Sequence, residues 1–387
     1  MTQAGVVVVG AGAVGCFIGG CLVHHGHGGA VTLVGRPTLQ AAVREAGLTL
    51  CGLGFESGAV HLPPDAAPTI VTDLHQCDWE GVGFALVAVK SGSTEQVAKE
   101  LAAAELPESV VVVSMQNGVD NARVLQQHLP SHTVVACVVG FNVVWRQPNA
   151  TFHRGTNTPL VVGALHISSD GAARRVARLL NEAARLETHV SAHIAHVQWT
   201  KLMMNLNNAL DALSRLPIRR QLGREAHRWT LAACQAEALR VFDAHPDIRL
   251  ERMGLFIPRI TPHLLRLPNW LYLRITPLRV TDEARGSMWQ DLAAGRPTEV
   301  YHLNGVIQRR GREKNIPTPV HDAVVATIRE AEKRKQSPRL EPEQLYERIV
   351  GSPFSHRHRQ SHALLALLLL LVAAVAVVVA LRYVALP

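Results

Sequence analysis

The sequence lacks the cysteine and histidine spacings that metal sites and disulfide frameworks require. Its six cysteines include no Cys-x-x-Cys pair, and its 20 histidines include no His-Glu-x-x-His motif or comparable ligand set. No secretory signal is recognisable at the N-terminus. We therefore expect no metal, a reducing cytoplasmic compartment, and cysteines that act as small buried hydrophobic residues.

Signatures of nucleic-acid binding are also missing. The chain has no zinc-finger spacing, no basic helix followed by heptads and no aromatic RNA-binding motif. It is nevertheless basic, with a formal net charge of +8, which favours anionic partners. Without a nucleic-acid module, we expect no nucleic acid among those partners.

The first part of the chain alternates apolar runs with helix-like segments, such as 94–105 and 119–128. Continuous apolar runs of β-branched residues are typical of parallel strands that are buried on both faces. The alternation predicts a doubly wound α/β sheet. The apolar runs lie at residues 4–10, 30–35, 84–89, 109–115, 133–140 and 159–165.

After about residue 190 the apolar residues follow a helical period, which predicts a second, mostly α-helical domain. Residues 245–280, rich in Pro, Leu and Arg, show no clear period and are interpreted as an irregular excursion. Its mixture of Trp, Tyr and Leu with Arg suits a membrane interface, but we favour a lid or a dimer contact. The expected helices lie at residues 192–214, 224–243, 281–295, 298–313 and 320–334.

The tail has a different composition. A basic stretch at 351–362 precedes 19 uncharged residues at 363–381, and a helix of that length spans roughly 28 Å, close to the hydrocarbon core of a bilayer. We therefore expect cytoplasmic catalytic domains that a C-terminal single-pass transmembrane helix anchors to a membrane. The expected domains are 1–190 (dinucleotide binding), 191–350 (helical), 351–362 (linker) and 363–381 (anchor).

Gly10, Gly12 and Gly15 follow the first expected strand in the G-x-G-x-x-G spacing and open an expected helix. In this context the spacing predicts a Rossmann-type dinucleotide site. Gly10 permits the tight turn, Gly12 lets the backbone approach a pyrophosphate, and Gly15 lets the helix pack on the strand. The N-terminus of the helix then supplies N–H donors to the phosphates.

The second expected strand ends in Gly35 and Arg36, where an NAD site would usually carry an acidic residue for the ribose diol. A guanidinium can pair with a 2′-phosphate, so Arg36 favours NADP(H) as the cofactor. The alternative is that Arg36 is an ordinary solvated surface residue.

The segment "QWTKLMMNLNNAL" reads as a mostly apolar helix, yet Lys201, Asn205 and Asn208 lie on one of its faces. Burying an unpaired ammonium is unfavourable by several kcal/mol. We therefore expect this polar face to line a cleft. Further cleft candidates are Lys90 and "QNG" with Asn117, which follow strands, and a later segment with Ser287 and Glu299.

Together these motifs resemble the ketopantoate reductase (2-dehydropantoate 2-reductase) family of the pantothenate and coenzyme A pathway. The matching features are "GAGAVG", "VK" after a strand, "QNG", "W-x-K-L-x-x-N" and "SM-x-QD-x-x-x-GR-x-TE-x-x-x-LNG", and they extend over nearly all of residues 5–335. The resemblance implies a Rossmann-type domain followed by an all-α domain like the C-terminal domain of 6-phosphogluconate dehydrogenase. It also implies an oxidoreductase that uses NADPH to reduce ketopantoate to pantoate.

The resemblance also implies roles for individual residues. Lys201 protonates the ketone oxygen, and Glu299 lies near Lys201 and the substrate hydroxyl. Ser287 binds the substrate carboxylate, and Asn205 contacts the substrate. Asn117 and Lys90 lie on the cofactor side.

The sequence departs from the family at two positions. Many members carry an asparagine where this chain has Ala209, and we expect Asn208 to take over that substrate contact. Members often also carry an asparagine shortly before the serine, where this chain has Ala284. Two alternatives therefore remain open: a related NADPH-dependent 2-keto acid reductase with another substrate, and a non-catalytic NADPH-binding membrane adaptor. A homodimer is a further possibility.

Overall fold

The computed structural model describes residues 4–55, 58–146, 149–166, 169–276 and 285–354. Its contacts divide the chain into two compact units whose segments alternate along the sequence. Unit 1 consists of Met1–Asn205, His245–Phe256 and Glu299–Val306, and unit 2 of Leu206–Ala244, Ile257–Thr298 and Ile307–Pro387. The simpler domain limits expected from the sequence stay a prediction.

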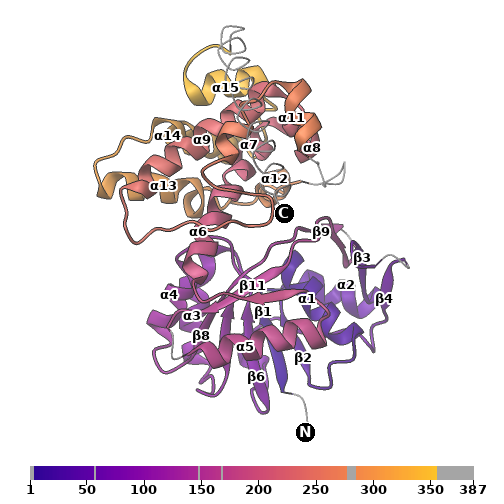
Figure 1. The fold of residues 1–387 in the computed structure, drawn as a ribbon. Helices are drawn as coiled ribbons and strands as arrows, with labels where there is room; N and C mark the ends of the chain where they lie inside the picture. The colour runs from indigo at the N-terminus through magenta and orange to yellow at the C-terminus, as the bar shows by residue number, and fades with distance from the viewer. Residues whose placement is uncertain (1–3, 56–57, 147–148, 167–168, 277–284, 355–387) are drawn as a thin grey trace, which may run out of the picture. The chain divides into compact units, whose positions relative to one another are not determined.

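Unit 1 is built on the expected doubly wound sheet (Figure 1). The spatial order of its strands is β12-β11-β8-β7-β6-β1-β2-β5, and all neighbours pair in parallel except β8 and β11. The strands are β1 (Gly5–Val9), β2 (Val31–Val34), β5 (Thr69–Val71), β6 (Val82–Val87), β7 (Val111–Ser114), β8 (Val134–Val138), β11 (Leu160–Ala164) and β12 (Thr188–Val190).

Burial explains the continuous apolar run at the start of the chain. Val6 and Val8 face a core shared with α1 (Ala13–His24) and α5 (Asp170–Arg178), whereas Val7 and Val9 face the core on the opposite side. That second core includes residues of α3 (Thr94–Ala103), α4 (Asn121–His128) and α6 (Ile194–Asn205). All four valines are at most 2% exposed, as expected for a strand covered on both faces.

The chain reverses its winding direction between β1 and β6. From β1 it continues to β2 and β5 on one side, and it later continues from β6 to β7 and β8 on the other. In open α/β sheets, ligands bind beyond the carboxyl ends of the strands at such a switch point. Gly10 and Lys90 follow β1 and β6 at this point.

A second, smaller sheet in unit 1 was not expected from the sequence. Its order is β4-β3-β10-β9, with β3 (Leu48–Gly52), β4 (Val60–Leu62), β9 (Val143–Arg146) and β10 (Thr151–Arg154). The strands are three to five residues long. Because β3 pairs with β10 from a distant part of the chain, no local pattern predicts the sheet.

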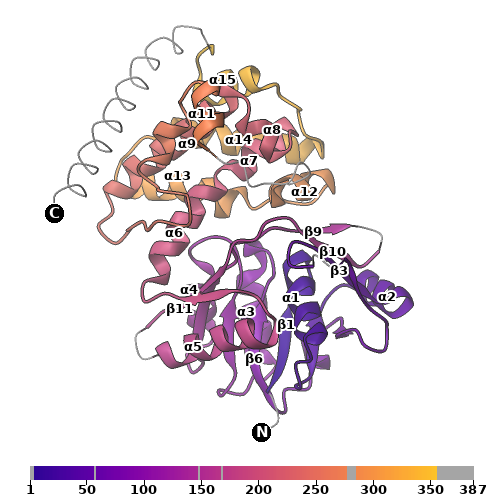
Figure 2. The same ribbon diagram turned by 45° about the vertical axis from the view of Figure 1, so that its right-hand side comes forward.

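Unit 2 is helical, as expected. Helix α9 (Glu225–Asp243) contacts α7 (Asn207–Ser214), α8 (Ile218–Leu222), α10 (Thr261–Leu264), α14 (Pro319–Arg334) and α15 (Pro342–Val350) (Figure 2). Helix α12 (Ser287–Ala293) packs on α7. Helix α13 (Asn304–Glu313) begins in unit 1 and ends in unit 2. The structure corrects the single helix expected at 192–214, because α6 ends at Asn205 and α7 starts at Asn207.

The excursion at 245–280 is more regular than expected, since it contains α10 and α11 (Asn269–Ile275). Arg228 of α9, which is fully buried, holds this segment. Its guanidinium donates to the carbonyls of Leu265 (3.1 Å) and Leu267 (2.7 Å) and lies 4.3 Å from the ring centroid of Tyr272. A buried cation therefore orders a segment that has no hydrophobic period of its own.

No helix within the described residues is long and apolar enough to cross a membrane. The transmembrane helix expected at 363–381 and most of the linker expected at 351–362 lie outside the described residues.

The glycine loop gives a stability prediction. A Cβ at Gly15 would lie 2.4 Å from the carbonyl oxygen of Gly10, whereas a Cβ at Gly12 would meet nothing within 4 Å. We expect Gly15→Ala to lower the free energy of unfolding by about 1–3 kcal/mol through overpacking. The matched variant Gly12→Ser, which adds a good N-cap residue, should change it by about 0.5 kcal/mol or less. Urea unfolding of the cofactor-free protein measures both, and equal losses would contradict the prediction.

Candidate active site

The loop between β1 and α1 has the shape of a phosphate cradle. Gly10 has φ +104°, and a Cβ there would lie 2.7 Å from the backbone nitrogen of Val89. Gly12 is the N-cap of α1 and faces open space, and the first turn of this helix carries neither an acidic residue nor a side-chain cap. The N–H groups of that turn are therefore available to an anion. The loop fits the pyrophosphate of a dinucleotide, whose binding here stays a prediction.

Arg36 lies beside this loop. It is the exposed N-cap of α2 (Pro37–Ala46), directly after β2. The preceding residue, Gly35, packs so closely on the loop that a Cβ there would lie 2.6 Å from Cβ of Ala11. The Arg36 side chain therefore begins at the point where the end of β2 packs against the glycine loop.

Glu299 is bound at the carboxyl end of β6. The backbone N–H of Ser91 donates to Oε1 of Glu299 (3.0 Å), and Oγ of Ser91 lies 2.9 Å from the same oxygen. Nζ of Lys90, which is half exposed, lies 3.8 Å from Oε2. Since Glu299 itself is only 6% exposed, these donors offset the desolvation of its carboxylate.

Asn117, which follows β7 in the "QNG" motif, links Ser91 to α6. Its carbonyl oxygen accepts from Oγ of Ser91 (2.8 Å) and from Nδ2 of Asn121 (2.6 Å). Its Oδ1 accepts from Nδ2 of Asn205 (3.1 Å). The single hydroxyl proton of Ser91 can go to Asn117 or to Glu299, but not to both at once. Hydrogen bonds thus run without a break from Glu299 through Ser91 and Asn117 to Asn205.

Lys201 lies on α6 one turn before Asn205. Its Nζ is 3.5 Å from the carbonyl oxygen of Gly140, and burial lowers the pKa of Lys201 to about 8. In the part of the chain that the structure describes, no carboxylate lies within ion-pair distance of this ammonium. Glu299, the carboxylate expected near Lys201, is held by Ser91 and Lys90, and its role beside Lys201 stays a prediction.

Unit 1 thus contains nine of the residues singled out in the sequence, and the hydrogen bonds connect several of them. The nine are Gly10, Gly12, Gly15, Arg36, Lys90, Asn117, Lys201, Asn205 and Glu299. Asn208 and Ser287 belong to unit 2, where Ser287 is the half-buried first residue of α12.

Two contributors to the network were not recognised in the sequence. Ser91 follows Lys90 directly, and Asn121 comes four residues after Asn117, so both lie beside motifs that were singled out. Asn121 also accepts from Oγ1 of Thr94 (2.8 Å). A hydroxyl or amide next to a strand end is common, so only the structure distinguishes these two residues.

The motif around Ser287 contains further buried polar residues. Asp291 is 2% exposed, and its carboxylate lies 3.5 Å from the guanidinium of Arg296, so the two form an ion pair within the motif. Asn304 is fully buried, and neither of its amide atoms has a hydrogen-bond partner among the described residues.

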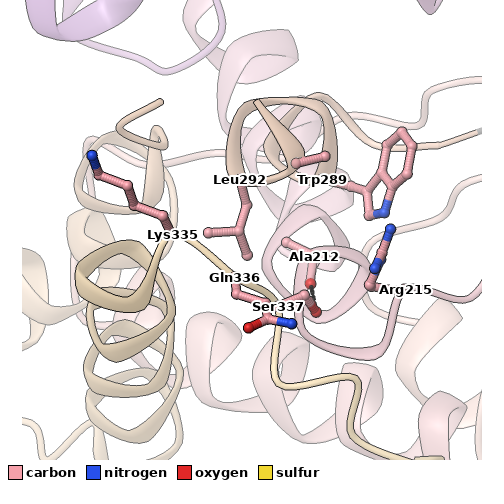
Figure 3. A pocket seen from close by; sticks show the side chains of 8 residues that line it. Ala212, Arg215, Trp289, Leu292, Lys335, Gln336 and Ser337 are labelled. Carbon is pink, nitrogen blue, oxygen red and sulfur yellow. Dashed lines mark hydrogen bonds between the residues drawn. The ribbon is translucent and has the colours of Figure 1, made fainter. Parts of the chain in front are cut away.

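Unit 2 contains a cavity of about 130 Å³. Figure 3 shows the Arg215 side chain directed toward the indole of Trp289, whereas the ammonium of Lys335 points away from them. None of the residues singled out in the sequence lines this cavity. The lining consists of Ala212, Arg215, Trp289, Leu292, Ala293, Lys335, Gln336 and Ser337.

Two family models match the chain. Residues 6–166 match the model described as "Ketopantoate reductase PanE/ApbA", and residues 193–332 match its C-terminal counterpart. Together the two matches extend over most of both units.

The curated relatives that match the chain include two proteins named 2-dehydropantoate 2-reductase. A 2-dehydropantoate 2-reductase from Halobacterium salinarum is 26% identical over 330 residues, which are 85% of this chain and 99% of the relative. One from Archaeoglobus fulgidus is 27% identical over 339 residues, with 84% and 97% covered.

Solved structures share the fold. A PanE/ApbA family ketopantoate reductase from Ralstonia eutropha is 28% identical, with a TM-score of 0.68 over 86% of this chain and 99% of that chain. A D-mandelate dehydrogenase solved with NADH and anilino(oxo)acetate has a TM-score of 0.69 over the same shares at 19% identity, which shows the fold alone.

The membrane-anchored localisation expected from the tail is contradicted. The family matches end at residue 332, and the described structure has no helix that could cross a membrane. We therefore correct that expectation: neither the residues that the structure describes nor the two family matches include a membrane-spanning helix.

Proposed function

Because the chain belongs to the ketopantoate reductase family, an oxidoreductase family, we propose that it reduces 2-dehydropantoate to pantoate with NADPH. The observation that carries this proposal is the hydrogen-bonded set in unit 1, which runs from Glu299 through Ser91 and Asn117 to Asn205, and Asn205 lies on the same helix as Lys201. The curated relatives named for this reaction support the same substrate.

The glycine loop and Arg36 account for cofactor binding. The N-terminus of α1 would hold the pyrophosphate, and the guanidinium of Arg36 would pair with a 2′-phosphate. Lys90 and Asn117 would line the cofactor from the ends of β6 and β7. When bound, NADPH supplies the hydride.

Lys201 is the proposed general acid. Ketone reduction builds negative charge on oxygen, and an ammonium placed there stabilises this charge and transfers a proton from Nζ. With a pKa of about 8, the side chain is mostly charged at neutral pH yet releases its proton more easily than an exposed lysine. Burial thus brings the acid close to its working pH.

The remaining residues would bind the substrate. Ser287 would donate its hydroxyl to the substrate carboxylate, and Asn205 and Asn208 would contact the polar groups beside it. Glu299 would accept from the hydroxyl of substrate and product. Its other contacts to Ser91 and Lys90 fix the carboxylate in place for this role.

A second candidate is the reduction of another 2-keto acid. The substitution that favours it is Ala209, a fully buried methyl group where many family members carry a polar contact. A less polar substrate side chain would tolerate that loss better than ketopantoate. The homodimer expected from the sequence remains a prediction.

A substrate panel tests the reaction. The purified full chain, NADPH and a series of 2-keto acids, including ketopantoate and one acid with an aromatic side chain, are followed by the loss of NADPH absorbance. We expect the highest kcat/KM with ketopantoate. A higher value with another acid would move the assignment to that acid, and NADPH binding without any turnover would leave only the non-catalytic alternative.

Lys201 gives a prediction with a defined pH dependence. Because the protonated form is the acid, kcat/KM for reduction should fall about tenfold per pH unit above pH 8, following the lowered pKa of Lys201. Lys201→Ala should lose about 10²-fold or more in kcat. Lys201→Arg keeps its positive charge throughout this pH range, so its kcat/KM should not fall near pH 8. If kcat/KM of this variant falls near pH 8 as it does in the wild type, Lys201 is excluded as the acid.

Arg36 determines the expected cofactor preference. Arg36→Asp should raise the KM for NADPH about tenfold or more and leave the KM for NADH nearly unchanged, because only NADPH carries the 2′-phosphate. The control is Arg44→Asp, the same charge change at an exposed position at the other end of α2. An equal effect of both variants would point to the overall charge rather than to Arg36.

A further inference from the structure

Asp211 is a fully buried carboxylate of α7 that has no part in the roles described above. Its Oδ2 accepts from the backbone N–H of Gly286, and its Oδ1 accepts from Nε2 of Gln221. Gly286 is the N-cap of α12 and directly precedes Ser287. A single side chain on α7 thus holds the start of the helix that carries Ser287.

Asp211 is itself fixed by a buried polar network. Gln221 of α8 accepts from Nδ2 of Asn207 (2.8 Å), and Oδ1 of Asn207 lies 3.2 Å from Nε2 of His227. Burial lowers the pKa of His227 to about 3, so this imidazole is neutral and donates through Nε2. Because Gln221 and His227 are fully buried, α8 and α9 brace the carboxylate of Asp211 against movement.

The two helices come close together at Gly286, where an added side chain would press on Asp211. A Cβ on Gly286 would lie 2.8 Å from Oδ2 of Asp211 and 3.2 Å from Oδ1 of Asn208. With φ at −70°, the backbone of Gly286 could be adopted by any residue, so an added side chain is limited by the contact with Asp211 rather than by the backbone conformation. The position of Ser287 is therefore set, one residue away, by Asp211 and Asn208.

A charged residue at this place is unfavourable for folding alone. Burial raises the pKa of Asp211 to about 7, against the opposing effects of the Gly286 N–H, Arg285 and Gln221. Apolar residues of similar volume often replace buried charges with no loss of stability. A leucine at this position, however, could not accept the N–H that precedes Ser287.

We propose that Asp211 is a positioning residue for substrate binding: it holds the Gly286–Ser287 turn on α7 so that the Ser287 hydroxyl receives the substrate carboxylate. The proposal rests on the proposed function and on the role given to Ser287 there. Small displacements of a binding group weaken binding strongly, so an acceptor one residue from the hydroxyl has a large effect on it.

Unit 2 offers a matched control. Glu237 is a carboxylate of α9 that is 1% exposed and accepts from the backbone N–H groups of His321 (2.8 Å) and Val320 (3.2 Å) at the start of α14. It therefore holds a helix start as Asp211 does, but that start carries no residue of the proposed site. Glu237→Gln reports the general consequence of neutralising such a carboxylate.

The experiment compares Asp211→Asn with Glu237→Gln in the full chain. The carboxylate of Asp211 accepts from the Gly286 N–H and from Nε2 of Gln221, whereas the amide of an asparagine would place its own NH₂ against one of these donors. Asp211→Asn should therefore loosen the Gly286–Ser287 turn. We expect its KM for the keto acid to rise about tenfold, equivalent to about 1.4 kcal/mol, with kcat changed less than about threefold and the KM for NADPH unchanged. Glu237→Gln should leave all three within about twofold.

A double-mutant cycle separates positioning from general destabilisation. If Asp211 acts through the Ser287 hydroxyl, adding Asp211→Asn to Ser287→Ala should raise KM less than about twofold further. Hydrogen–deuterium exchange should accelerate at the start of α12 in Asp211→Asn and at the start of α14 in Glu237→Gln.

The outcomes are distinguishable. Normal turnover by the wild type with an unchanged KM in Asp211→Asn, or an equal rise in Glu237→Gln, would overturn this proposal alone. Additive effects of Asp211→Asn and Ser287→Ala would also overturn it. No turnover of any keto acid by the wild type would instead overturn the proposed function, and with it the role of Ser287.

Discussion

The hydrogen bonds between Ser91 and Glu299 join two parts of the chain that are 208 residues apart. They return the chain to the end of β6 after the first two segments of unit 2, and they place a buried carboxylate at the switch point of the sheet. Ser91 also contacts Asn117, which contacts Asn205, so the ends of β6 and β7 and the helix of Lys201 share one network. Without the hydrogen bonds between Ser91 and Glu299, the candidate site would lose its carboxylate. The third segment of unit 1 would also lose its polar contacts with the end of β6.

Three buried carboxylates in this protein follow one physical rule. Glu299, Asp211 and Glu237 each accept a backbone N–H from a segment distant in sequence, namely from Ser91, Gly286 and His321. A charge removed from water is tolerated when such donors replace its hydration. The same N–H groups therefore offset the cost of removing each carboxylate from water and hold two elements of the structure together. Asn205 of α6 fits the same rule, since its buried amide donates to Oδ1 of Asn117.

The sequence predicts the features that depend on local pattern. Apolar runs predict the strands of the large sheet because both faces of each strand are covered, and the glycine spacing predicts the loop after β1. The resemblance to the family supplies the candidate residues, including Lys201 and Glu299. The partners of Glu299, the pairing of β3 with β10 and the division of 192–214 at Leu206 are long-range or tertiary effects. No glycine or proline marks that division, so no spacing rule predicts it.

The interleaving of the two units imposes an order of assembly during synthesis. A ribosome releases the glycine loop, Ser91, Asn117 and Lys201 long before it releases Glu299, which comes only after the first two of the three segments of unit 2. Domains commonly fold in the order in which they emerge, but the third segment of unit 1 reaches its neighbours last. Truncated or stalled chains therefore contain the lysine and the nucleotide loop without the carboxylate. The proposed catalytic set is completed only in chains whose translation has passed through the first two segments of unit 2.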